Sequence, residues 1–226
     1  MEISGPVRRL MAKANNDKST EKWQSKKSAL MRDRIVVGAL ECIVQFGYEN
    51  TTMAKIAKMA KVSPGAMQYH FGSKLEAIKA AIDHLHSVRL AQHHRALQEV
   101  PEGFNPIDYT YDLYWAQLNE DHFIAYQDLV IAARTDPELA NVLRPAYRRF
   151  LKAWRQNAFG EVPEWANIER FDVIADLAQY LMEGLAYGRL NSQLSEERTS
   201  RLLKLTKKLV IELLDEELSR NEIRKQ

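Results

Sequence analysis

The apolar pattern between Thr51 and Lys74, TTMAKIAKMAKVSPGAMQYHFGSK, predicts two short helices. In the first helix, apolar residues recur at i, i+3, i+4 and i+7 and form a single stripe. They are Met53, Ile56, Ala57 and Ala60. Ser63 followed by Pro64 is the signal of an N-cap and a first helical position, and Gly72 ends the second helix. Two short helices joined by a tight turn indicate a helix-turn-helix.

The second of these helices is predicted to bury Met67 and Phe71. Its outward residues are Gly65, Ala66, Gln68 and Tyr69. A short helix that presents small, amide and phenol groups suits insertion into the major groove of DNA. A partly buried, purely structural Tyr69 is the alternative.

Helical patterns flank this pair. An amphipathic stretch from about 28 to 46 ends at Gly47. Ser73 and Glu76 form a capping box, which opens a helix that extends to about residue 98. Pro101 and Pro106 mark a linker. These patterns place four helices in the first 98 residues.

Further helical segments follow, without strand-like alternation. They lie near 106–117, 120–134, 137–158, 165–191 and 195–221. Pro145 should kink or divide one of them. The chain is therefore predicted to be all-α, with about nine helices. Residues 1–27 are basic and have no sustained period, which predicts a flexible basic arm that either reaches DNA or is a terminus without a role.

The last two segments carry the most apolar surface. A helix that is apolar on several sides is buried in its own domain or against a partner. Pairing with a second copy would form a four-helix interface in a homodimer, whereas the alternative is an intrachain core. The candidate interface residues are Leu181, Gly184, Leu185, Gly188, Leu205, Leu209 and Leu213.

The charges are unevenly distributed along the chain. Residues 1–79 hold 14 Lys and Arg against 7 Asp and Glu, whereas residues 80–226 hold 18 against 23. A basic amino-terminal third favours a polyanionic partner, unless it is simply solvated. The one cysteine, Cys42, is expected in the core. With neither a membrane span nor a secretory signal, we expect a cytoplasmic protein without a membrane partner.

Residues from about Arg34 to Leu85 resemble the tetracycline-repressor-like (TetR) family of transcriptional regulators. The resemblance rests on Gly47-Tyr48, Thr51-Thr52, Ile56-Ala57, Val62-Ser63, Gly65, Phe71 and Ser73-Lys74. Lys61 departs from the family pattern, because Gly is most common in that turn; a positive φ there would cost about 1 kcal/mol. Gln68 stands where Tyr is frequent, and an amide can pair with an adenine edge.

The resemblance implies a helix-turn-helix DNA-binding domain over residues 28–80 and a helical effector-binding and dimerisation domain over 81–226. It implies a homodimer that represses from a palindromic double-stranded DNA operator and is released by a small-molecule effector. Gly65, Ala66, Gln68 and Tyr69 would face bases. Phosphate contacts are implied for Thr51, Thr52, Lys55, Ser63, His70 and Lys74, although His70 could instead be structural.

Aromatic residues supply candidates for an effector pocket, which would take a largely apolar ligand. The candidates are Tyr111, Trp115, Phe123, Tyr126, Phe150, Trp154 and Tyr180, with Tyr114 beside them. Plain core packing is the alternative. The histidines at 84, 86, 93 and 94 lack a completing ligand set, so we expect neither a metal nor another cofactor.

The sequence contains no catalytic motif of the common kinds, and we expect no enzyme. The remaining alternative is a helical dimeric ligand-binding or adaptor protein without sequence-specific DNA binding.

Overall fold

The computed structural model describes the backbone of residues 5–224 and the side chains of residues 23–220. These residues form nine α-helices, one 3-10 helix and no strand, which confirms the all-α prediction. The helices are α1 (Gly5–Asn50), α2 (Met53–Met59), α3 (Pro64–His70), α4 (Lys74–Gln98), α5 (Pro106–Leu118), α6 (Asp121–Ala132), α7 (Pro137–Glu161), η1 (Pro163–Asn167), α8 (Phe171–Leu190) and α9 (Glu196–Arg224).

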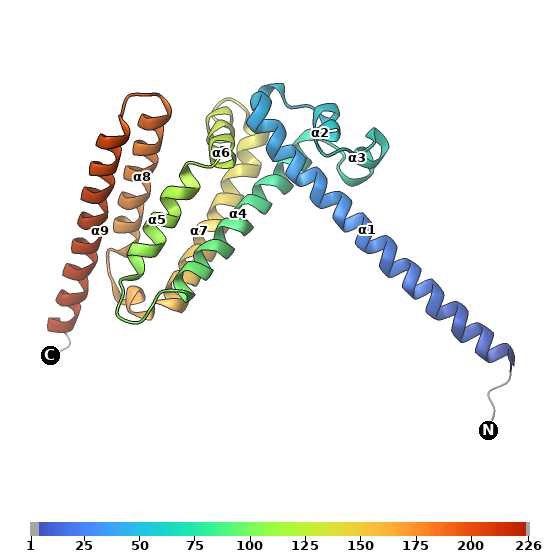
Figure 1. Ribbon diagram of the computed structural model, residues 1–226, viewed down its shortest axis with the longest axis horizontal. Helices are drawn as coiled ribbons and strands as arrows, with labels where there is room; N and C mark the ends of the chain where they lie inside the picture. The colour runs from blue at the N-terminus through green and yellow to red at the C-terminus, as the bar shows by residue number, and fades with distance from the viewer. Residues whose placement is uncertain (1–4, 225–226) are drawn as a thin grey trace. The chain divides into compact units, whose positions relative to one another are not determined.

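The chain divides into two compact units between Ala81 and Ile82, called here the front unit and the rear unit. In the front unit, α2 and α3 pack beside the carboxy-terminal part of α1 (Figure 1). Ile35, Ile56 and Met67 are the centre of its core, and each is at most 2% exposed. The free thiol of Cys42 is buried in the same core, as predicted.

The ends of the front helices are set by local signals that the sequence contains. Gly47 adopts φ 73° and interrupts the helical backbone of α1. The Ser63 hydroxyl accepts a hydrogen bond from the Ala66 N–H at 3.1 Å, which caps α3. Glu76 N–H donates to the Ser73 hydroxyl at 3.1 Å, as a capping box requires, but the Glu76 carboxylate accepts from Gly72 rather than Ser73. The predicted helix starts therefore follow from hydrogen-bond chemistry.

The turn between α2 and α3 is tight and strained. Lys61 adopts φ 52°, the left-handed conformation that L-residues other than glycine disfavour. The Arg34 guanidinium donates to the carbonyls of Ala60 and Lys61 at 2.7 and 2.9 Å. Gly38 lets α1 approach this turn, because a Cβ there would lie 2.8 Å from the Ala60 nitrogen. These contacts from α1 hold the turn in its strained conformation.

The predicted flexible arm, residues 1–27, differs from the observed backbone. Residues 1–4 lie outside the described residues, and the chain is helical from Gly5 onward. Helix propagation needs no apolar face when good helix formers follow one another and no helix breaker intervenes. After Pro6, residues 7–27 contain neither glycine nor proline, and they include good helix formers in five Lys, two Arg, two Ala, one Leu and one Met. The absence of an apolar period was therefore a poor guide to the backbone here.

The rear unit contains the second core, built from α5 to α9 and the last part of α4. Pro145 neither divides α7 nor ends it, since the helix runs from Pro137 to Glu161. Residues 163–167 form the 3-10 turn η1, so α8 begins at Phe171, later than predicted. α8 and α9 lie side by side (Figure 1). No described helix is long and apolar enough to cross a membrane.

Candidate functional sites

The outward face of α3 is polar and open. Met67 and Phe71 are buried at 2% and 3% exposure, whereas Tyr69 is 81% exposed. Gln68 and Gly65 are also exposed, and a Cβ added at Gly65 would meet nothing within 4 Å. Ala66 is half-buried on the same helix. The prediction of which α3 residues point inward and which point outward is therefore confirmed, and a buried structural role for Tyr69 is ruled out.

The phosphate-contact candidates around this face differ in how far the fold already uses them. Thr52 and Ser63 are exposed N-caps, and His70 packs edge-on against the Tyr69 ring at 5.0 Å. Lys55 donates to the Asn50 carbonyl at 2.7 Å. Lys74 donates to the Tyr48 carbonyl at 3.1 Å, and its ammonium lies 4.0 Å from the Tyr48 ring centroid. An ammonium has three donors, so both lysines keep donors for an anion.

Thr51 has to be removed from the predicted contacts. Its side chain is only 1% exposed, and its hydroxyl donates to the Gly47 carbonyl at 2.8 Å. Gly47 needs such a partner because its positive φ breaks the helical ladder at that point. Thr51 therefore holds the loop before α2 instead of facing a partner.

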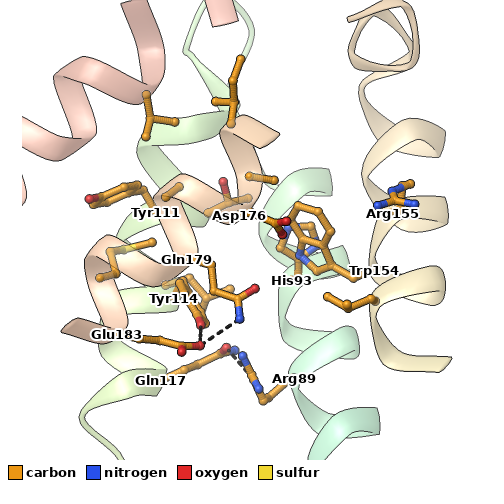
Figure 2. Close-up of a pocket in the computed structure, with 18 of the residues that line it drawn as sticks. Arg89, His93, Tyr111, Tyr114, Gln117, Trp154, Arg155, Asp176, Gln179 and Glu183 are labelled. Atoms are coloured by element: carbon orange, nitrogen blue, oxygen red, sulfur yellow. Dashed lines mark hydrogen bonds between the residues drawn. The ribbon is translucent and has the colours of Figure 1, made fainter. Parts of the chain in front are cut away.

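The rear unit encloses an apolar cavity of about 160 Å³, and Figure 2 shows many of its lining side chains. Five of the predicted aromatics line it: Tyr111, Phe123, Tyr126, Phe150 and Trp154. Two predicted residues do not. Trp115 packs against the rear core, and Tyr180 is 64% exposed on the opposite side of α8. Helical spacing alone could not assign these two residues to a face, because both helices are apolar on several sides.

Polar side chains that the sequence analysis did not select also line the cavity. Arg89 comes from α4, Gln117 from α5, and Gln179 and Glu183 from α8 (Figure 2). Arg89 Nε donates to the side-chain amide oxygen of Gln117 at 3.4 Å, and the Arg89 guanidinium lies 4.8 Å from the Phe150 ring centroid. No motif marks these residues, since Arg, Gln and Glu at helical positions usually face solvent.

Glu183 accepts two hydrogen bonds within the cavity. The Tyr114 hydroxyl donates to it at 2.8 Å and the Gln179 amide at 2.9 Å (Figure 2). Burial, and after it the charge of Glu183, raises the pKa of Tyr114 well above its ordinary value of 10.0. Tyr114 therefore keeps its proton and remains a donor at neutral pH.

The histidines of α4 are packed among aromatic rings. His86 stacks on Phe150 at 4.7 Å, and His93 lies 5.2 Å from the Trp154 ring. Burial lowers the pKa of both imidazoles from 6.5 to about 4, so both are neutral at pH 7. No group of three or more His, Cys, Asp or Glu suited to a metal ion occurs in the described part of the chain. These two histidines are core residues.

The candidate dimer residues fall on two sides of α8 and α9. Leu185 is 9% exposed and belongs to the monomer's own packing, and a Cβ at Gly188 would lie 2.8 Å from Leu194. Leu213 packs against the rear core, and Leu181 is half-buried. By contrast, Leu205 and Leu209 are 62% and 39% exposed, and a Cβ at Gly184 would meet nothing within 4 Å.

Comparison with known proteins agrees with this geometry. Residues 35–81, the helix-turn-helix region, match the family model of bacterial regulatory proteins, tetR family. The transcriptional regulator TcmR of Streptomyces glaucescens is 37% identical over 76 residues, covering 34% of this chain and 32% of TcmR. The negative transcriptional regulator IcaR of the biofilm operon icaADBC in Staphylococcus aureus is 31% identical over 62 residues, covering 26% of this chain and 33% of IcaR.

The whole fold also has counterparts among solved structures. A transcriptional regulator from Rhodococcus sp. Rha1 superposes with a TM-score of 0.59 at 22% identity, covering 80% of this chain and 96% of that one. At this identity the likeness shows the fold alone. The sequence matches span about a third of the length of the two curated relatives above.

An amino-terminal helix-turn-helix, followed here by a helical unit with an apolar cavity, is the mark of a helix-turn-helix transcriptional regulator. Residues 35–81 carry the DNA-binding domain of bacterial regulatory proteins of the TetR family. The relatives named above are regulators, in agreement with the prediction that the chain is not an enzyme.

Proposed function

We propose that the protein is a ligand-responsive transcriptional repressor that binds a palindromic DNA operator as a homodimer. The observation that carries the proposal is the exposed face of α3. Its Gln68 and Tyr69 side chains lie at the surface, where they do not contribute to the packing of the fold. An amide can pair with an adenine edge, and an aromatic ring can contact a thymine methyl. The match of residues 35–81 to the family model supports the same face.

The basic residues around the α3 face supply the sequence-independent part of binding. Lys58 and Lys61 are exposed, and neither is held by a carboxylate in the described part of the chain. Phosphate contacts of this kind fix register and make binding fall with salt. We assign Thr52, Ser63, His70 and Lys74 to the same role, as the resemblance implies.

The exposed apolar surface of α8 and α9 supports a homodimer. On α8, Val173, Leu177, Tyr180 and Tyr187 follow one another at spacings of four, three and seven, which places them on one face. Each is at least 37% exposed, and Leu205 and Leu209 add to this surface on α9. Contiguous apolar surface of this kind marks an interaction site. We therefore centre the proposed interface on these residues and on Gly184, and we leave out Leu185 and Gly188.

A dimer matters because one seven-residue recognition helix reads few base pairs. Two copies about one helical turn of DNA apart would read the two halves of a palindrome.

Substituting both Tyr180 and Leu205 by Glu should give a monomer at micromolar concentration, measured by sedimentation. The control is Glu at Ile131 and Val130, which are 63% and 42% exposed on α6. A wild-type protein that is already monomeric would contradict the proposed interface.

The cavity of the rear unit is the proposed effector site. Its lining is mostly aromatic and aliphatic, with a few polar groups, as is typical of small-molecule sites. α4 contributes Ala77 and Ala81 to the front core and Arg89 and His93 to the cavity. One helix thus carries residues of the front core and of the cavity, so that ligand binding can be coupled to DNA binding. Such coupling is reciprocal: DNA must lower the affinity for the ligand by the same factor by which the ligand lowers the affinity for DNA.

The test is selection of bound sequences from random double-stranded DNA, repeated with candidate ligands. An inverted repeat should emerge, and its binding should be lost when Gln68, Tyr69 and Lys74 are all replaced by Ala. If binding survived this triple substitution with an unchanged salt slope, the assigned face would be wrong. Enrichment of no sequence would favour the second candidate, a dimeric ligand-binding or adaptor protein, which the cavity and the apolar α8–α9 surface would also serve.

A further inference from the structure

The Arg89 guanidinium is an unusual group for the wall of an apolar cavity. The residue is only 9% exposed, and three aromatic rings surround the guanidinium at 4.8 to 5.5 Å. Its Nε donates to Gln117 across 3.4 Å, a long and weak hydrogen bond. Among the described side chains, residues 23–220, no carboxylate forms an ion pair with it. A buried charge without a partner is strongly unfavourable.

Glu183, a half-buried acid that lines the same cavity, already has hydrogen-bond partners. One of its oxygens accepts from Tyr114 and from Gln179, so neutral donors already stabilise its charge. Tyr114 also connects the two charged groups, because its ring centroid lies 5.5 Å from the guanidinium carbon of Arg89. Unmet hydrogen-bonding capacity remains at two groups of the cavity wall. Nδ1 of His93 is buried without a partner, and the structure shows a hydrogen bond from only one of the five guanidinium N–H groups of Arg89. The charged group among the two is Arg89, because His93 is neutral at pH 7.

We infer that the effector is a small carboxylic acid whose carboxylate pairs with Arg89 while its apolar body fills the aromatic part of the cavity. This inference rests on the proposal that the cavity holds the effector. A guanidinium binds a carboxylate through two parallel, charge-assisted hydrogen bonds, which a single neutral hydroxyl cannot reproduce. The surrounding rings exclude water and so strengthen the pair.

The size of the cavity limits the body of the acid. The volume is about 160 Å³, and an apolar cavity of about 150 Å³ accommodates a benzene-sized molecule. A single aromatic ring, or an acyl chain of comparable volume, therefore fits. Larger acyl groups or fused ring systems would require the walls to move.

The test measures binding to the full-length protein without DNA, by titration calorimetry at constant pH and ionic strength. The probes are phenylacetate and octanoate, each compared with the alcohol and the amine of the same carbon skeleton. We expect each acid to bind at least about tenfold tighter than its alcohol, as a charge-assisted pair implies. This comparison uses the wild-type protein only, so it does not depend on the folding of any variant.

Variants then locate the carboxylate. Arg89→Met should weaken the acids about tenfold to a hundredfold and leave the alcohols nearly unchanged. Arg95→Met, an exposed arginine on the same helix, is the matched control and should change neither. Glu183→Gln should leave the acids bound at least as tightly as before, because it removes a like charge and keeps an acceptor for Tyr114.

Three results would overturn the inference: equal binding of acid and alcohol, tighter binding of the amine with its loss in Glu183→Gln, or no binding of any probe. Operator release is measured separately, by fluorescence anisotropy of labelled DNA. Acids that bind through Arg89 without releasing DNA would support the carboxylate site at Arg89 and contradict the proposed ligand control. A neutral or cationic ligand that releases DNA would support the proposed ligand control and contradict a carboxylic acid as the effector.

Discussion

The two units use polar side chains in opposite ways. In the front unit the candidate functional groups lie outside a small apolar core, and Tyr69 is 81% exposed. In the rear unit they lie inside, where Arg89 is 9% exposed and Glu183 is held by two donors. An exposed polar face costs nothing in desolvation until a partner arrives, whereas a buried polar group must be satisfied at once. This difference explains why the front unit suits a large polyanion and the rear unit a small ligand.

The largest effect is expected from removing the α3 face while keeping the front core. Replacing Gln68 and Tyr69 by Ala should weaken specific operator binding about a hundredfold or more, since each base contact contributes roughly 1–3 kcal/mol. Because both side chains are exposed, the thermal unfolding midpoint should hardly change. The comparison is made by fluorescence anisotropy with specific and random DNA. Glu41→Gln with Val44→Ala, on the exposed side of α1, serves as control.

Gly38→Ala tests how tightly the front unit is packed behind that face. The new Cβ would lie 2.8 Å from the Ala60 nitrogen, so α1 and the turn must separate, at a cost of about 1–3 kcal/mol. Urea denaturation measures the loss. Gly160→Ala, where a Cβ meets nothing within 4 Å in α7, should instead be neutral or stabilise by up to about 1 kcal/mol. Equal effects at the two positions would contradict the close approach of α1.

The stability of the rear unit should depend on pH between 6.5 and 5 more than that of the front unit. The folded pKa of His86 and His93 is lowered to about 4 by burial. The unfolded chain therefore binds more protons in this window, and the free energy of unfolding falls as the pH falls. The loss reaches about 2 kcal/mol per histidine at most, from 1.36 kcal/mol per pKa unit.

Tryptophan fluorescence follows the rear unit in this experiment, because Trp115, Trp154 and Trp165 lie there, whereas Trp23 of the front unit is 62% exposed and responds little to folding. Replacing His86 and His93 by Gln should flatten the pH dependence, whereas His84→Gln, at an exposed position, should not. The front unit has a single histidine, His70. An equal loss of stability in the front unit between pH 6.5 and 5 would therefore contradict the proposed difference between the two units.

The smallest effect is expected at the turn between α2 and α3. Lys61→Gly relieves the positive φ of 52° and should stabilise the front unit by about 1 kcal/mol. If Lys61 contacts a phosphate, the same change should reduce the slope of binding against salt by about one. Lys58→Ala removes an equal charge without changing the turn, so it should affect salt dependence but not relieve strain. If Lys61→Gly left the stability unchanged, the contacts from Arg34 would hold the turn without strain energy at Lys61.

The sequence by itself determined most of the front unit. Ser63 caps the start of α3 through a hydrogen bond from the Ala66 N–H, and Pro64 takes the first helical position. Met67 and Phe71 fix which side of the helix is buried. Such local signals operate over a few residues, so they can be recognised without knowing the fold. The helix over residues 5–27 escaped prediction because it shows no apolar period, the signal on which the prediction relied.

Only the tertiary structure decided the rear site. Arg89 and Gln117 are 28 positions apart and meet only when α4 and α5 pack together, and Glu183 joins them from α8. The same packing turned Tyr180 outward and enclosed Phe150, although both are aromatic residues on helices. Which side of a helix is buried depends on its neighbours when apolar residues surround it. The sequence therefore determined α3 and its exposed face, whereas the packing of distant helices decided which residues line the cavity.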